Sequence, residues 1–186
     1  MTDSTGPSDA DLTRLLDETR GDDAAADRSR QRWLRQQALS DARLDGVLQA
    51  SAEQHQNVTL RLVSGGAYTG TVDQLGEDFC TVTTATGHAL VRLGAIVVVL
   101  PDPSLAVVAP TGGRVARAHL NFVEALGEYA EDRPAVVLGL LGQAEKARGT
   151  LLAVGADVAT LEINERGSLA YVSLGSVTDA SFLLSG

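Results

Sequence analysis

The sequence contains one pattern of glycine and aspartate twice, and this repeat constrains the fold more than any other feature of the chain. One constant offset in the numbering relates three pairs of identical residues: Gly70 and Gly149, Gly76 and Gly155, and Asp78 and Asp157. A further match, Leu93-Gly94 with Leu174-Gly175, has an offset that is larger by two. The two extra residues fall between these matches, where the turn 164–167 is longer than the turn 86–87. Insertions of this kind are tolerated at hairpin tips, so we interpret the pattern as an internal repeat.

Between these glycines, apolar and polar residues alternate in short segments, which predicts β-strands. The predicted strands are 58–63, 68–75, 78–85, 88–93 and 95–100 in the first copy, and 136–141, 147–154, 157–163, 168–173 and 176–184 in the second. Gly70 lies inside a predicted strand, where glycine often marks a sharp bend. Five short strands joined by tight turns predict a small closed β-barrel in each copy.

A helical pattern precedes each group of strands. Residues 24–54 contain no proline and predict a long helix, with Trp33 and Leu48 on its apolar stripe. A second helix is expected over 114–130, and its apolar stripe consists of Val115, Ala118, Phe122, Leu126 and Tyr129. This stripe is too apolar to remain in water, so we expect it to pack against the strands or against a partner.

The predicted fold class is therefore mainly β with added α-helices, in two repeated units that each consist of an α-helix followed by a five-stranded barrel. The expected organisation is an N-terminal tail with a short helix (1–23), a long helix plus the first barrel (24–100), a linker rich in proline and glycine (101–113), and a helix plus the second barrel (114–186).

Composition excludes several classes of function. The net charge of −9 opposes binding to phosphate backbones, and aromatic residues, which make up 4% of the chain, offer few platforms for stacking bases. A single cysteine, Cys80, excludes an intrachain disulfide and a metal site built from cysteines. The N-terminus has no apolar signal segment, and no apolar run is long enough to cross a bilayer. We therefore expect a cytoplasmic protein that does not contact membranes.

No group of residues predicts an enzyme, a cofactor site or a metal site. His55, His88 and His119 lack the spacing of metal ligands, and Cys80 lies in an alternating apolar segment that indicates burial. Asp78 and Asp157 recur after glycine and are interpreted as turn residues that accept hydrogen bonds from local backbone N–H groups, with paired carboxylates as the alternative.

The repeated order of helix, bent strand pair, third strand after a Gly-x-Asp turn and final hairpin resembles the Sm-like barrel, a relative of SH3-like barrels. The residues that carry this resemblance are Val58-x-Leu60-x-Leu62, Gly65 and Gly70-x-Val72 for the first half of the Sm motif, and Arg92-Leu93-Gly94-Ala95-Ile96 for the second. The whole chain also resembles a family of uncharacterised actinobacterial proteins with tandem barrels of this kind. That family implies no known reaction.

The resemblance does not carry RNA binding with it. The positions at which Sm proteins have a conserved aspartate and a base-binding asparagine are occupied by Gly76 and Cys80 in the first copy, and by Gly155 and Ala159 in the second. We therefore expect a non-catalytic interaction or scaffold protein. The alternative is a regulatory protein that binds RNA or DNA through its barrels or through the arginines of its N-terminal helix.

The expected partner is a protein, either a second copy, which would give a homo-oligomer, or a different chain; specific nucleic-acid binding is not expected. The candidate interaction residues are Trp33, Phe122, Tyr129, Arg32 and Arg35. Trp33 is the one tryptophan and is expected to anchor the N-terminal helix on a barrel or a partner. The arginines lie among acidic residues, which is typical of a solvated helix face and leaves contact with phosphates as the alternative.

Overall fold

The computed structural model describes residues 28–34, 36–37, 40–102, 119–163 and 167–183. The chain divides into two compact units, residues 1–42 and residues 43–186. In the first unit, residues 28–34 are helical and Trp33 is 62% exposed. The second unit contains every strand that the structure describes.

The helix predicted over 24–54 is interrupted, so that prediction of one long helix is wrong. Asp41, Ala42 and Arg43 are not helical, and helix α2 occupies Leu44–Glu53. Arg43 has an extended backbone (φ −116°, ψ 151°) and its guanidinium contacts Asp45 at 3.4 Å. Asp45 lies in the first turn of α2, where a carboxylate is favoured by the partial positive charge of the helix N-terminus. A new helix therefore begins here.

The strands agree with the predicted segments to within one residue at each end. Those of the first half are β1 (Asn57–Leu62), β2 (Ala67–Leu75), β3 (Phe79–Thr84), β4 (Gly87–Arg92) and β5 (Ile96–Pro101). Those of the second half are β6 (Ala135–Leu140), β7 (Ala147–Val154), β8 (Val158–Glu162), β9 (Leu169–Ser173) and β10 (Val177–Leu183). Short 3-10 helices, η1 (Leu93–Ala95) and η2 (Leu174–Ser176), precede β5 and β10. The prediction of a mainly β fold with added helices is confirmed.

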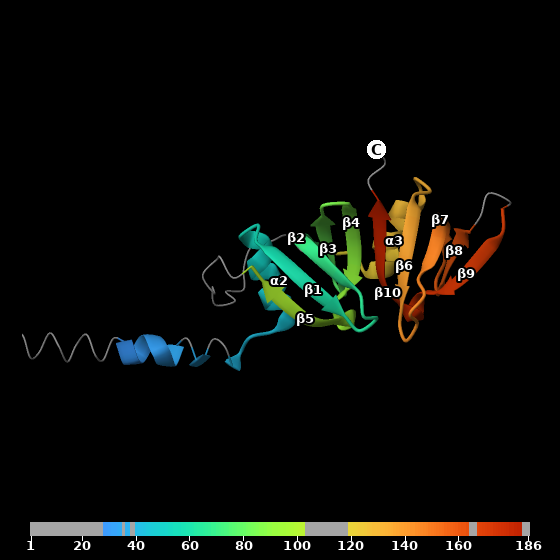
Figure 1. Ribbon diagram of the computed structural model, residues 1–186. Helices are drawn as coiled ribbons and strands as arrows, with labels where there is room; N and C mark the ends of the chain where they lie inside the picture. The colour runs from blue at the N-terminus through green and yellow to red at the C-terminus, as the bar shows by residue number, and fades with distance from the viewer. Residues whose placement is uncertain (1–27, 35, 38–39, 103–118, 164–166, 184–186) are drawn as a thin grey trace, which may run out of the picture. The chain divides into compact units, whose positions relative to one another are not determined.

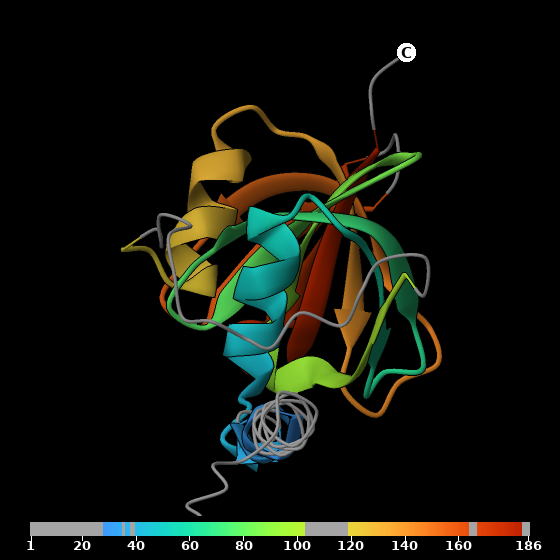
Figure 2. The same cartoon turned by 90° about the vertical axis from the view of Figure 1, so that its left-hand side faces the viewer.

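The strands form one open antiparallel sheet of ten, in the order β5-β1-β2-β3-β4-β10-β6-β7-β8-β9 (Figure 1). The two halves are joined because β4 pairs with β10, the last strand of the chain. The strands curl round instead of lying flat, and α2 and α3 (Phe122–Ala130) lie against them (Figure 2). The expected two separate, closed barrels are thus replaced by a continuous sheet with β5 and β9 at its edges.

Strand pairing in the second half corresponds to that in the first half residue by residue. The pairs Val58 with Pro101, Leu60 with Val99, and Leu62 with Ile96 correspond to Val136 with Phe182, Leu138 with Ala180, and Leu140 with Val177. The register irregularity that precedes the last of these pairs is also present in both halves. His55 and Arg133 follow the two helices at equivalent positions, and both have positive φ (49° and 47°). The correspondence therefore extends from the helices to the final strands.

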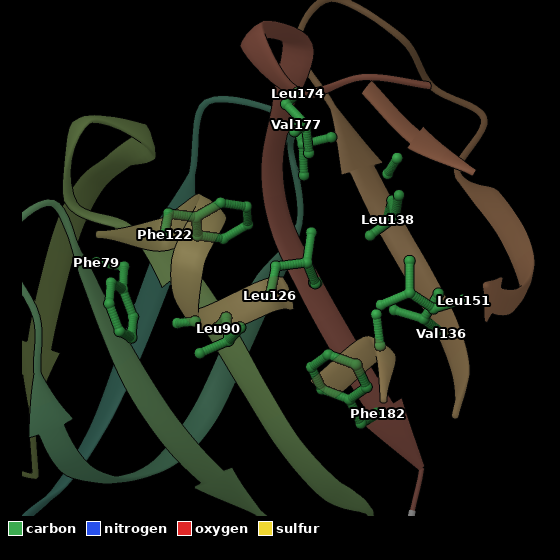
Figure 3. Close-up of a cluster of buried hydrophobic side chains, with 14 of the residues drawn as sticks. Phe79, Leu90, Phe122, Leu126, Val136, Leu138, Leu151, Leu174, Val177 and Phe182 are labelled. Atoms are coloured by element: carbon green, nitrogen blue, oxygen red, sulfur yellow. The ribbon is translucent and has the colours of Figure 1, made fainter. Parts of the chain in front are cut away.

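Two hydrophobic clusters fill the sheet, and β4 contributes to both. Val91 and Ala89 lie in the first cluster, with the apolar residues of β1 to β3 and of α2. Leu90, on the opposite face of β4, lies in the second cluster with Leu138 and Leu151 (Figure 3). Because side chains alternate across a strand, both faces of β4 are buried, and the two halves cannot separate without exposing Leu90.

Helix α3 (Phe122–Ala130) packs against β7 and β4 and begins later than the predicted residue 114. Asn121 is not helical, and its side chain accepts hydrogen bonds from the N–H groups of Val123 and Glu124, while Glu124 accepts one from the N–H of Asn121. This capping box fixes the start of the helix. Phe122 and Leu126 are fully buried, so this part of the apolar stripe packs inside the chain. Val115 and Ala118 lie outside the described residues.

Candidate interaction surfaces

The two halves meet where β4 pairs with β10, and we call this contact the joint. Arg92, the last residue of β4, stabilises it. Its Nε donates to the carbonyl oxygen of Val177 (3.0 Å) and its Nη2 to that of Leu174 (3.3 Å). The guanidinium also lies 4.2 Å from the centre of the Phe122 ring, a cation–π contact. One side chain of the first half thus binds η2, β10 and α3 of the second half.

Asp78 connects Arg92 to the N-terminus of α3. One carboxylate oxygen accepts from Nη1 of Arg92 (2.7 Å), and the other accepts from the backbone N–H of Phe122 (2.6 Å). The prediction that the Asp78 side chain accepts hydrogen bonds from local backbone N–H groups is therefore wrong, because its partners are 14 and 44 residues away. The backbone contact of this residue recurs in both halves: the Asp78 carbonyl oxygen accepts from the N–H of Leu93, and the Asp157 carbonyl oxygen accepts from the N–H of Leu174.

A second polar contact across the joint pairs Tyr68 of β2 with Asp179 of β10. The Tyr68 hydroxyl donates to Asp179 Oδ2 (2.7 Å), and the hydroxyl of Thr178 donates to the other oxygen (2.7 Å). Asp179 is 1% exposed, and Gly139 opposite it leaves room for the carboxylate, because a Cβ on Gly139 would overlap it. Burial, reinforced by the Asp179 carboxylate, raises the pKa of Tyr68, so the tyrosine is the proton donor of the pair.

Three aromatic side chains, from β4, β10 and α3, stack on one another at the joint. The ring of Phe182 in β10 lies 5.2 Å from that of His88 in β4 and 4.4 Å from that of Tyr129 in α3. His88 and Phe182 border a cavity of about 320 Å³ whose other lining residues are mainly small or hydroxyl-bearing. Burial is the main cause that raises the pKa of Tyr129, with the carboxylates of Glu128 and Asp73 adding to it.

In the sheet formed by the described residues, the two terminal strands, β5 and β9, each have one free edge. β5 pairs with β1 alone and β9 with β8 alone, so each has one side without a neighbouring strand. Large hydrophobic side chains are exposed on both edges: Val97, Val98 and Leu100 on β5, and Leu169 and Tyr171 on β9. Exposed edges with apolar side chains are templates for pairing with a further strand.

The corresponding positions at the joint are buried. Leu90 is the counterpart of Tyr171 in the repeat, and it is 1% exposed, whereas Tyr171 is 70% exposed. Asp179 is the counterpart of Val98, and it is 1% exposed, whereas Val98 is 38% exposed. These edge residues thus occupy positions that the neighbouring half covers at the joint.

The candidate residues from the sequence do not gather at one site. Phe122 is buried and packs edge-on against Phe79, with ring centres 6.4 Å apart, so in this fold it belongs to the core and not to a free surface. Tyr129 is half-buried in the aromatic stack. Trp33 is exposed on the helix 28–34, where the Arg32 guanidinium donates to Ser29 (3.0 Å). Arg35 lies outside the described residues.

No role was predicted from the sequence for the residues at the edges and at the joint. Comparing the two copies position by position would have found them, because Asp179 replaces Val98 and Arg92 is replaced by Ser173. Both differences mark contacts that only one copy makes.

The one cysteine of the chain, Cys80, lies in β3. Cys80 is buried, and this burial raises the pKa of its thiol to about 12, so it is neutral and unreactive near pH 7. Among the described residues no group of three or more His, Cys, Asp or Glu side chains is arranged to hold a metal ion. Their helices include none with the length and hydropathy needed to cross a membrane.

Comparison with models of protein families gives no match for this chain, and comparison with curated proteins gives none either.

Proposed function

We propose that this chain is a non-catalytic interaction or scaffold protein, built from two Sm-like halves, whose interaction sites are the two free edges of the sheet, β5 and β9. The partner is a protein that supplies an edge strand. Binding by strand addition uses backbone hydrogen bonds for affinity and side chains of alternate residues for specificity.

The repeated register supports the view that both halves are copies of one unit. Each half has a helix, five strands in the same order and a 3-10 turn before the last strand. Glycines 70 and 149 lie where β2 and β7 pass close to β3 and β8, since a Cβ on either would overlap a backbone carbonyl of the neighbouring strand. These features agree with the resemblance to Sm-like barrels.

The observation that carries the proposal is the exposure of apolar side chains along both edges. Natural proteins usually protect an edge strand with charges, prolines or a covering segment. β9 has no charged residue, and β5 has none either and carries one proline, Pro101, at its end. An apolar, uncharged edge at each end of a sheet is typical of a protein that assembles.

The test compares the full chain with a variant in which both edges carry lysine, Val98→Lys with Tyr171→Lys. The control is Leu141→Lys, which introduces the same charge at an exposed leucine in the loop after β6. Isolated under mild conditions from the cells that make them, the native chain and the control should carry bound protein, either further copies or another chain. The edge variant should lose it.

Recovery that is equal for all three chains would contradict the proposal. Tight, sequence-specific binding to RNA or DNA that survives the edge substitutions would favour the nucleic-acid alternative instead.

A further inference from the structure

We propose that the partner is a second copy of this chain, bound head to tail: β9 of one copy pairs antiparallel with β5 of the next, in the register of the β4–β10 joint. This inference rests on the proposed function of the two edges and names what binds there. The joint already contains this interface once, between the two halves of a single chain.

The register follows from the repeat. At the joint, Val91 pairs with Asp179 and Leu90 with Ala180. Replacing each of these residues by its counterpart in the other half gives Val172 opposite Val98, and Tyr171 opposite Val99, of the next copy. The other strand pairs of the two halves correspond in the same way, so the same pairing geometry is available to the edges.

The helices extend this correspondence beyond the strands. Leu44, the first residue of α2, corresponds to Phe122, the first residue of α3. Phe122 is fully buried against Phe79 of the preceding half, whereas Leu44 is 39% exposed. In the head-to-tail contact Leu44 meets Val158, the counterpart of Phe79, and Tyr171 meets the face of α2 beside it. Both apolar side chains then leave water.

The hydrogen bond between Tyr68 and Asp179 is replaced as a pair, whereas the guanidinium contacts of Arg92 have no equivalent, because its counterpart is Ser173. The hydrogen-bonded pair Tyr68 and Asp179 corresponds to Ala147 and Val98 at the new contact, so a hydroxyl and a carboxylate are both replaced by apolar groups. No buried carboxylate loses its donor, which would be costly. At both positions, in β7 and β5, an apolar residue stands where the joint has a polar one.

One polar contact is retained. At the joint Asp78 accepts the N–H of Phe122 at the N-terminus of α3. Its counterpart Asp157 is exposed, and the residue preceding α2, Arg43, provides no side-chain cap for that helix. Asp157 of one copy can therefore accept the N–H of Leu44 in the next, where the helix N-terminus favours a carboxylate.

The contact is heterologous, because different surfaces of the two copies meet. Such contacts repeat from copy to copy and produce either a closed ring or a filament. Pro101 has no N–H to donate; since the N–H of Asp102 points towards β1, the nitrogen of Pro101 faces the free edge. The proline therefore limits the pairing to the part of β5 before it.

The decisive experiment uses cysteine substitutions in the full chain, with the buried Cys80 left in place. Chains that carry only Val98→Cys are mixed with chains that carry only Val172→Cys under mild oxidation. Val98 and Val172 face each other in the expected register and form a non-hydrogen-bonded pair, because their backbone N–H and C=O groups point away from the shared edge. In such pairs the side chains of an antiparallel sheet come closest, which favours a disulfide. A disulfide between the two kinds of chain is expected, and neither kind alone should cross-link.

The matched control is Leu169→Cys in place of Val172→Cys, because it lies on the same exposed edge but three residues out of register; it should give little cross-linking.

Light scattering over a range of concentrations supplies the second measurement. The native chain should form species larger than a monomer, and Tyr171→Lys should weaken this association by about tenfold or more, because a lysine would be buried without a partner. Leu141→Lys should not weaken it.

Three results would overturn the inference: a native chain that stays monomeric at every concentration, cross-linking of Val98→Cys chains with themselves, or equal cross-linking at positions 169 and 172. None of these removes the proposed function, which fails only if no protein, copy or other, depends on the two edges.

Discussion

The Tyr68 hydroxyl donates a 2.7 Å hydrogen bond to the carboxylate of Asp179, a residue 111 positions later that is almost completely buried. This bond crosses from the second strand of one half to the last strand of the other. Replacing Tyr68 by Phe should therefore lower the free energy of unfolding by about 1–3 kcal/mol, because it leaves a buried acceptor without its donor. Urea unfolding measures the change. Tyr171→Phe is the control, since that ring is exposed, and an equal loss in both variants would contradict the assigned bond.

Phe122 tests whether the apolar stripe of α3 belongs to the core. Phe122→Ala should cost about 3–5 kcal/mol of stability, as expected for truncating a fully buried aromatic side chain. Trp33→Ala removes a larger ring from an exposed position and should change the melting temperature little. A Phe122→Ala chain that melts like the native protein would show that the ring is not packed as described.

Arg92 should determine how firmly the two halves are joined. Arg92→Met keeps much of the aliphatic stem over Phe122 but removes the donors to Leu174 and Val177, at a cost of about 1–3 kcal/mol. Hydrogen exchange should become faster in β4 and β10 and stay unchanged in β1 and β2. Arg61→Met, at an exposed position in β1, is the control. Uniform acceleration over the whole sheet would mean that Arg92 does not act at the joint.

The pH dependence of stability should reflect Cys80. Burial raises its pKa from 9.0 to about 12, so folding favours the neutral thiol. The resulting contribution is complete below pH 9 and is lost as the pH rises from 9 towards 12, because the unfolded chain then ionises while the folded one does not. Burial raises the pKa of Tyr68 as well, which adds to the loss in the same direction. Urea midpoints measured below and above pH 9 should fall less in Cys80→Ala than in the native chain.

The strands could be predicted from the sequence because each signal is local. Glycine marks the turns, alternation marks the buried face, and a repeat provides each boundary twice. The start of α3 was missed although the sequence contains one signal for it, the capping box formed by Asn121 and Glu124. The other cause is not local, because Asp78, 44 residues away, binds the first helical N–H.

The joint could not be predicted, because nothing local indicates which strand pairs with β4. The two copies differ at Arg92, Asp179 and Gly139. These differences can be assigned to the joint only when the pairing of β4 with β10 is known. The edge sites have the same origin: Tyr171 is unusual only by comparison with the buried Leu90.

The role of the edges as interaction sites is tested most directly by hydrogen exchange of β5 and β9 in the native, full-length chain. Exchange is measured in dilute protein, and then at high concentration or in the presence of the recovered partner. The amides of β5 and β9 that face the free side of each strand should become protected together, while those of β1, already paired on both sides, should stay as they were. Edges that exchange equally fast under both conditions would contradict this role.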